Sequence, residues 1–254
     1  MKLRILGCSG GIGAGLRTSA MLLDDDVLID AGTGVGDLSL EEMLRIDHVF
    51  ITHAHLDHVC SIPFLVDAVG YKRQAPLTVY AIAQAVHALR AHVFNDVIWP
   101  DFTRLPRADA AYLRFHTIEP GETVTLSGGK LTALAADHLV PTVGFWLDSG
   151  AASLVFTGDT GPNDALWKVV NGIANLRYLI IETAFCNRDL KIAVASKHLC
   201  PSLLAQEIRK LRRPAEIFIN HLKPGDRLLT LSEIAEALPA WRPTALEHGQ
   251  VFEF

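Results

Sequence analysis

The sequence predicts an α/β protein in which two β-sheets are sandwiched between helices, and three observations support this fold class. Apolar runs typical of strands alternate with longer amphipathic segments typical of helices. Their order along the chain is strands, helices, strands, helices, which fits two sheets with helices outside them. Half of the 254 residues are hydrophobic, enough for a sizeable core. Because no linker, repeat or low-complexity segment divides the chain, we predict one domain over residues 1–254.

The first half of the chain combines strands with two longer helices. Runs 19–23 and 27–30 flank three aspartates, which predicts a hairpin with a solvated acidic turn. Residues 7–15 are rich in glycine but match neither the dinucleotide fingerprint nor the Walker pattern, so we interpret them as a flexible loop near the site. Residues 95–102 interleave aromatic and polar side chains, which predicts either a lid or substrate wall or a packed connection. The strands predicted here are 2–6, 19–23, 27–30, 47–51 and 77–81, and the helices are 59–69 and 84–94.

The second half is richer in strands. Short apolar runs recur there at close spacing and end in polar side chains. The helix predicted at 200–211 is amphipathic with a basic end, which suits the helix dipole and requires no ligand. The strands predicted in this half are 113–118, 123–126, 131–136, 144–147, 153–157, 178–181 and 216–220, and the helices are 163–170, 200–211 and 231–237.

A histidine-rich motif stands at the end of one predicted strand. Residues 52–58 contain the imidazoles of His53, His55 and His58 and the carboxylate of Asp57. A strand end is a rigid place for metal ligands. His53 and His55 alternate and can converge on one ion, while Asp57 and His58 lie on the following turn and can serve a second. Imidazole and carboxylate ligands suit Zn, with Mn or Fe as alternatives.

Further candidate ligands also follow apolar strands. His138, Asp159 and His221 each stand at a predicted strand end. We predict one site from His53, His55 and His138 and a second from Asp57, His58 and His221, with Asp159 as a bridge. Two ions about 3.5–4 Å apart would hold a bridging hydroxide, a nucleophile at neutral pH. Asp30 either orients a metal-bound imidazole or caps a turn, and both interpretations stay open.

Composition narrows the function classes. The net charge of −5 argues against a general nucleic-acid surface, which would be basic. No apolar run reaches membrane-spanning length, and the N-terminus enters a strand without a signal-peptide pattern. The four cysteines form no CxxC pair and are typical of free thiols in a reducing compartment: Cys8, Cys60, Cys186 and Cys200. We therefore predict a cytoplasmic protein that does not bind a membrane and forms no stable complex with a nucleic acid.

Residues 52–58, with His138, Gly158-Asp159 and His221, resemble the metallo-β-lactamase superfamily over nearly the whole chain and in the right order. The resemblance implies the metallo-β-lactamase αββα sandwich, two mixed β-sheets flanked by helices. It also implies two divalent metal ions, usually zinc. Spacing alone does not establish that fold.

A narrower resemblance concerns the class II cyclic nucleotide phosphodiesterases. Residues 53–63, ending in Ser61-Ile62-Pro63, are similar to that family's signature, as are segments 92–100, 196–199 and 220–224. The resemblance implies hydrolysis of the 3′,5′-cyclic phosphodiester of cAMP or cGMP to the 5′-nucleotide, a small-molecule nucleotide partner and a homodimer. We predict that Asn95 and Trp99 contact this substrate.

Glu182 and His198 resemble the Glu–His pair that ribonuclease Z and related phosphodiesterases place beside their metals. A carboxylate that holds an imidazole can position it to protonate the leaving ribose 3′-oxygen. Together with Asp57 of the histidine motif, Glu182 and His198 are the predicted catalytic residues.

Three other functions compete with a cyclic nucleotide phosphodiesterase. A tRNA 3′-processing endonuclease like ribonuclease Z shares the histidine–aspartate motif and the Glu–His pair, but the acidic balance and the lack of an evident tRNA-binding arm oppose it. A thioester hydrolase or lactonase needs no such leaving-group histidine. A non-catalytic binding or sensor protein often loses metal ligands, whereas this chain retains the full set.

Overall fold

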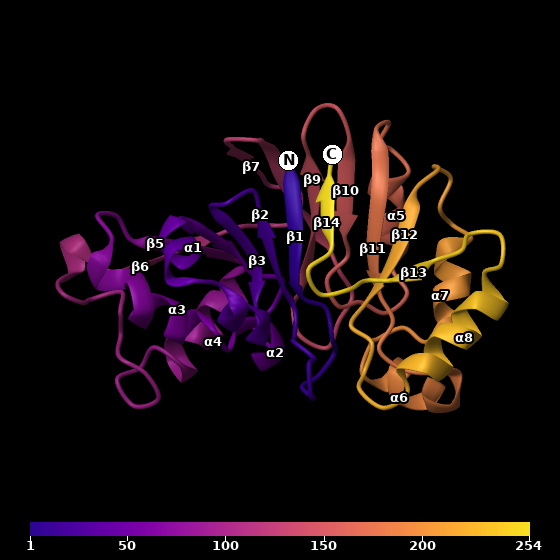
Figure 1. The fold of residues 1–254 in the computed structure, drawn as a ribbon, viewed down its shortest axis with the longest axis horizontal. Helices are drawn as coiled ribbons and strands as arrows, with labels where there is room; N and C mark the ends of the chain where they lie inside the picture. The colour runs from indigo at the N-terminus through magenta and orange to yellow at the C-terminus, as the bar shows by residue number, and fades with distance from the viewer.

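The computed structural model describes residues 1–254 and confirms the two mixed sheets with flanking helices (Figure 1). The first sheet contains β1 (Lys2–Gly7), β2 (Ala20–Leu23), β3 (Val27–Ala31), β4 (His48–Phe50), β5 (Leu77–Ala81), β6 (Leu113–Thr117) and β14 (Val251–Glu253). The second contains β7 (Thr123–Leu126), β8 (Gly129–Ala135), β9 (Val143–Asp148), β10 (Ser153–Phe156), β11 (Leu176–Glu182), β12 (Glu216–Asn220) and β13 (Thr244–Ala245). The helices are α1 (Leu40–Arg45), α2 (Leu56–Val59), α3 (Ile62–Val69), α4 (Ala83–His92), α5 (Asp164–Val170), α6 (Leu190–Ala195), α7 (Pro201–Ile208) and α8 (Arg227–Ala237).

Both sheets follow the same pairing pattern. The first runs β14-β1-β2-β3-β4-β5-β6, antiparallel up to β3 and parallel from β3 to β6. The second runs β7-β8-β9-β10-β11-β12-β13, antiparallel up to β10 and parallel from there to β13. The carboxyl ends of neighbouring parallel strands meet at one edge of each sheet, where polar side chains can gather.

Strand alternation divides the core into two layers. On β10, Leu154 and Phe156 join the large cluster shared with the first sheet, while Val155 points to the helix-covered face. The rings of Phe50 and Phe145 meet edge to face across the two sheets, with centroids 6.0 Å apart. Leu204 of α7 is buried in the outer cluster of the second sheet. The sandwich therefore fixes the strand ends of both sheets relative to each other.

Most predicted elements are confirmed, with shifts of a few residues at their ends. The helix predicted at 59–69 is confirmed as α3 but begins three residues later, because α2 ends at Val59 and the chain turns at Cys60-Ser61. The Ser61 hydroxyl donates to the Gly32 carbonyl oxygen at 2.8 Å, and Pro63 occupies the start of α3, where its missing N–H costs nothing. The sequence analysis missed α1, α6, β13 and β14, all of them short.

No helix is long and apolar enough to span a bilayer.

Candidate metal centre

The histidine motif leaves the end of β4 and turns into α2. Thr52, His53 and His58 are fully buried, while His55 and Asp57 are partly exposed. α2 begins directly after His55, so the following residues turn away from the strand direction. His53 and His55 therefore lie on the loop after β4, whereas Asp57 and His58 lie in α2.

Three imidazoles from two sheets converge on one point. His53 Nε2 lies 2.9 Å from His55 Nδ1, and His138 Nε2 lies 3.3 Å from the same atom. The other ring nitrogens are also held, because His53 Nδ1 contacts Thr52 Oγ1 at 3.0 Å and His138 Nδ1 lies 3.1 Å from the Lys197 carbonyl oxygen. The sequence analysis assigned no role to Thr52 or Lys197. Lys197 acts through its backbone, for which a sequence carries no signal.

A second group lies beside the first. Asp57 Oδ2 is 3.7 Å from His58 Nε2 and 3.8 Å from His221 Nε2. His221 follows β12 with a positive φ of 63°, and its N–H donates to the Cys8 carbonyl oxygen at 2.9 Å. Gly10 packs so closely here that a Cβ would lie 2.3 Å from the His221 carbonyl oxygen. The glycine-rich loop is therefore next to the site, as predicted, and only glycine fits at this contact.

Asp159 lies between the two groups. Its Oδ2 is 3.3 Å from His58 Nε2 and 3.8 Å from His53 Nε2, and its Oδ1 is 3.3 Å from His221 Nδ1. It follows β10 through Gly158, whose φ of 62° turns the chain. All predicted ligands thus lie in one cluster, in the two groups that the sequence analysis expected, although metal binding by each residue stays a prediction.

The residues present fit divalent cations. His58 Nε2, Asp159 Oδ1 and His221 Nδ1 are buried and have no hydrogen-bond partner. Leaving such atoms unsatisfied is costly. A cation coordinated by these imidazoles and the carboxylate would satisfy them, and the donor set suits Zn or a similar metal.

The electrostatics favour the metal-binding form of most of these imidazoles. Burial holds the pKa of His53, His55 and His138 below the usual value and lowers that of His221 to about 3. These rings are therefore neutral at neutral pH, the form that binds metals. Burial acts in the same direction on His58, but the adjacent carboxylates of Asp159 and Asp30 outweigh it and raise the His58 pKa well above the usual value.

Asp30 orients His58. The His58 Nδ1–H donates to Asp30 Oδ2 at 2.7 Å, and the backbone N–H and hydroxyl of Thr52 donate to Asp30 Oδ1, each at 2.9 Å. The Asp30 side chain is fully buried. Of the two interpretations left open by the sequence, this geometry supports the imidazole-orienting one, because His58 Nε2 is thereby directed at Asp159.

Glu182 and His198 form a buried pair beside the cluster. His198 Nδ1 lies 2.6 Å from Glu182 Oε1, and the carboxylate also accepts backbone N–H groups of Thr160 and Ala184, each at 3.1 Å. The His198 ring stacks on the His221 ring with centroids 5.3 Å apart. Burial raises the Glu182 pKa. Burial opposes protonation of His198, but the Glu182 charge outweighs it and raises the His198 pKa.

His198 has a second potential role. Its ring nitrogen lies within 4.8 Å of ligand atoms of His138 and Asp159, close enough to share an ion with them. The pairing with Glu182 and the position beside the cluster are therefore shown by the geometry, whereas proton donation and metal binding are separate hypotheses.

Asn95 and Trp99 lie outside the ligand cluster. The Asn95 Oδ1 accepts the backbone N–H groups of Val97 and Ile98 at 3.0 and 2.9 Å, and its amide donates to the Ala91 carbonyl oxygen at 3.1 Å. The Trp99 ring meets Phe64 at 5.2 Å between centroids. Asn95 thus stabilises its own loop, and contacts of either residue with a substrate stay predictions.

Comparisons with known proteins agree with this fold and site. A family described as the Beta-lactamase superfamily domain matches residues 26–221. The chain belongs to the beta-lactamase superfamily, whose metallo-hydrolase fold it shares.

Among individual proteins, the chain is 26% identical to a probable 3′,5′-cyclic-nucleotide phosphodiesterase of Yersinia pestis, over 91% of this chain and 82% of that protein. It is 30% identical to a ribonuclease Z of Kineococcus radiotolerans, over 54% of this chain and 45% of that protein. The solved structure of unliganded yeast PDE1 superposes with a TM-score of 0.82 at 17% identity, over 100% of this chain and 99% of that one, which is a likeness of fold.

Proposed function

We propose that this protein is a dinuclear metal-dependent phosphodiesterase that hydrolyses 3′,5′-cyclic nucleotides to 5′-nucleotides. The observation that carries the proposal is the buried Glu182–His198 pair beside a cluster of histidines and aspartates. The similarity to the Yersinia pestis phosphodiesterase over most of both chains supports the substrate class. Two zinc ions suit the donor set, with Mn or Fe as alternatives. A cytoplasmic location and a homodimer remain predictions.

The proposed roles of these residues are of two kinds, metal binding and proton transfer. When bound, the divalent ions would neutralise charge on the phosphate and lower the pKa of a water molecule. His53, His55 and His138 would hold one ion, Asp57, His58 and His221 the other, and Asp159 would contact both. His198 would protonate the ribose 3′-oxygen, because an alkoxide is a poor leaving group. Glu182 favours the protonated imidazole and fixes its ring.

The test is hydrolysis of 3′,5′-cyclic AMP and cyclic GMP by zinc-loaded protein, with an unprocessed tRNA in parallel. We expect turnover of a cyclic nucleotide and no tRNA cleavage. Metal content is measured on the same sample, so that an inactive preparation is not mistaken for a wrong substrate. Absence of cyclic nucleotide turnover with metals bound would contradict the proposal and leave only a metallo-hydrolase.

Ribonuclease Z-like tRNA processing is the second candidate. The identity to the Kineococcus radiotolerans ribonuclease Z favours it, although the match covers less than half of that protein. The net charge of −5 disfavours it, since tRNA binding rests on contacts between basic side chains and phosphates. Cleavage of the precursor tRNA in the parallel assay would reverse the order of the two candidates.

A further inference from the structure

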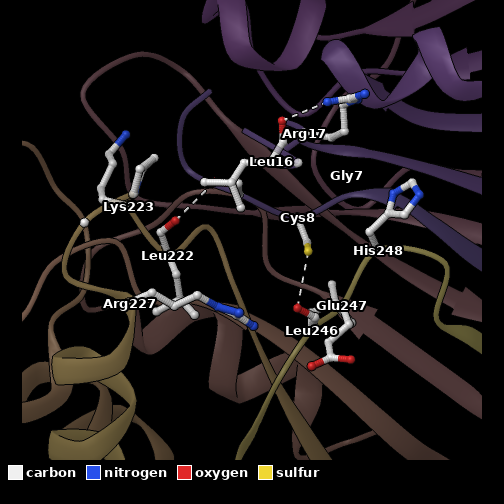
Figure 2. A pocket seen from close by; sticks show the side chains of 14 residues that line it. Gly7, Cys8, Leu16, Arg17, Leu222, Lys223, Arg227, Leu246, Glu247 and His248 are labelled. Carbon is white, nitrogen blue, oxygen red and sulfur yellow. Dashed lines mark hydrogen bonds between the residues drawn. The ribbon is translucent and has the colours of Figure 1, made fainter. Parts of the chain in front are cut away.

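A cavity lies beside the segment that follows His221. Its volume is about 330 Å³, within the range of small-molecule sites. Figure 2 shows its walls, which come from the glycine-rich loop, the segment after His221, the start of α8 and the segment before β14. None of the predicted metal ligands lines it. The cavity is therefore distinct from the metal centre, although both share one stretch of backbone.

The Arg227 guanidinium is the one cation of the lining without a partner. Its side chain makes no ion pair or hydrogen bond with the protein. The Lys223 ammonium donates to the Gly10 carbonyl oxygen at 2.5 Å, and its charge adds to burial in lowering the pKa of His221, so it lies towards the metal centre. Arg17 is neutralised by Asp37, with Nε 2.9 Å from Oδ2. Glu247 supplies the one carboxylate of the lining.

Arg227 and Glu247 shift the pKa of Cys8, which lines the cavity, in opposite directions. Burial raises the pKa of the Cys8 thiol to about 11, and the Arg227 charge lowers it while the Glu247 charge raises it. In Figure 2 the two side chains extend towards each other below Cys8. They form no ion pair, so each remains available to a ligand. A guanidinium is suited to a phosphate, and a carboxylate accepts hydrogen bonds from hydroxyl or amino groups.

The backbone at the cavity adds donors. α8 begins at Arg227, and no side chain caps its first turn. The first N–H groups of a helix have no partner within the helix and favour anions. Asp226, just before α8, pairs with Arg188 at 2.9 Å and does not occupy this position.

We propose that this cavity binds a small phosphomonoester, with Arg227 contacting the phosphate and Glu247 contacting a hydroxyl or amino group of the organic part. The proposal does not depend on the reaction at the metal centre. It assigns a function to the glycine-rich loop, which no step of the proposed hydrolysis uses.

The test counts binding sites on the metal-loaded protein by equilibrium dialysis with radiolabelled 5′-AMP. Because a metal centre also binds phosphates, we expect the wild-type protein to bind nearly one equivalent more than Arg227→Ala does, at a 5′-AMP concentration that only just fills the additional site of the wild-type protein. Loss of the guanidinium should weaken this additional site about tenfold or more, the effect of one charge-assisted hydrogen bond. Arg114→Ala is the matched control, because Arg114 is exposed and unpaired on β6, away from the cavity, and should retain wild-type binding.

Two further measurements guard against a purely structural effect of Arg227→Ala. Glu247→Gln removes the opposing carboxylate and should tighten the binding of inorganic phosphate at the same site, which an unfolded α8 would not do. Hydrolysis of cyclic AMP by Arg227→Ala should equal that of the wild-type protein, so failure of the metal centre is recognised separately.

The relative affinities of 5′-AMP and inorganic phosphate distinguish an organic phosphate ligand from free phosphate. Binding of 5′-AMP about tenfold more tightly than inorganic phosphate would support an organic phosphate ligand, and equal binding would support free phosphate as the occupant of the same contacts. Equal 5′-AMP stoichiometry in the wild-type protein and Arg227→Ala would overturn the proposal.

Discussion

The two sheets have the same topology but supply the candidate site in different ways. In each, antiparallel strands lead into parallel ones, and a buried aspartate lies at or just after the end of the first parallel strand: Asp30 is the second-last residue of β3, and Asp159 follows β10. Both aspartates contact His58, Asp30 at Nδ1 and Asp159 at Nε2. One topological position thus serves to orient an imidazole in one sheet and to join two groups of ligands in the other.

The sheets differ in how they distribute the other ligands. The first concentrates four of them in residues 53–58, on one loop after β4. The second supplies His138, Asp159 and His221, each after a separate strand. A loop holds its spacing locally, whereas the dispersed residues meet only because the sandwich is formed. We therefore expect the second sheet to be the more sensitive half of the site.

The largest effect is expected at Asp159. Asp159→Ala should abolish hydrolysis and lower the metal content, since both ligand groups lose their shared carboxylate. The loss should exceed the roughly 10²–10⁴-fold that a proton donor supplies. Elemental analysis and kcat/KM measure it, with Asp164→Ala as control, because the Asp164 side chain is exposed, pairs with Lys210 and belongs to no group of candidate ligands. Full activity in Asp159→Ala would refute the bridging role.

His198 should give the next largest effect, and a selective one. His198→Ala should slow hydrolysis of cyclic AMP by about 10²–10⁴-fold, because the ribose 3′-oxygen needs a proton. Hydrolysis of bis(p-nitrophenyl) phosphate, whose leaving group needs none, should fall far less. Equal losses on both substrates, with depleted metal, would identify His198 as a ligand in place of a proton donor.

Asp30→Asn tests the first sheet. The amide oxygen can still accept from Thr52, but the charge that holds His58 is lost, so metal affinity should fall about 10–100-fold. Competition with a chelator of known affinity measures this change. A loss as large as that of Asp159→Ala would remove the difference between the two aspartates.

The smallest effect concerns stability at the contact between α1 and β1. The Ser39 backbone N–H and the Arg4 guanidinium lower the pKa of Glu42 to about 2, below its ordinary 4.5. Its contribution is therefore complete above pH 4.5 and is lost as the pH falls towards 2. Since the pair is partly exposed to solvent, Glu42→Gln should cost only about 0.5–1 kcal/mol at pH 7. Urea unfolding at pH 7 and pH 3 measures it, with the neighbouring Glu41→Gln as control, and a pH-independent difference would contradict this origin.

The same contrast between the sheets explains what the sequence revealed. The histidine motif is contiguous, and the strands before His138, Asp159 and His221 are regular apolar runs, so the layer order and the residues that gather in the cluster were predictable. The choice between two roles for Asp30 was not, because it depends on where His58 lies after folding. Likewise, α6 and β14 lack a strong periodic pattern, and β14 exists because β1 offers it an edge.

The pairing of β14 with β1 joins the beginning and the end of the chain. The Met1 ammonium donates to the Phe254 carbonyl oxygen at 2.9 Å, so the termini are neighbours (Figure 1). Both termini lie at the start of β1. This strand is roughly 20 Å long, and the glycine-rich loop and His221 lie at its other end. The polypeptide is thus nearly a closed ring, and a short peptide could link its ends. New termini could then be opened at exposed loops, and fusion partners attached to Met1 or Phe254 would project away from the metal centre.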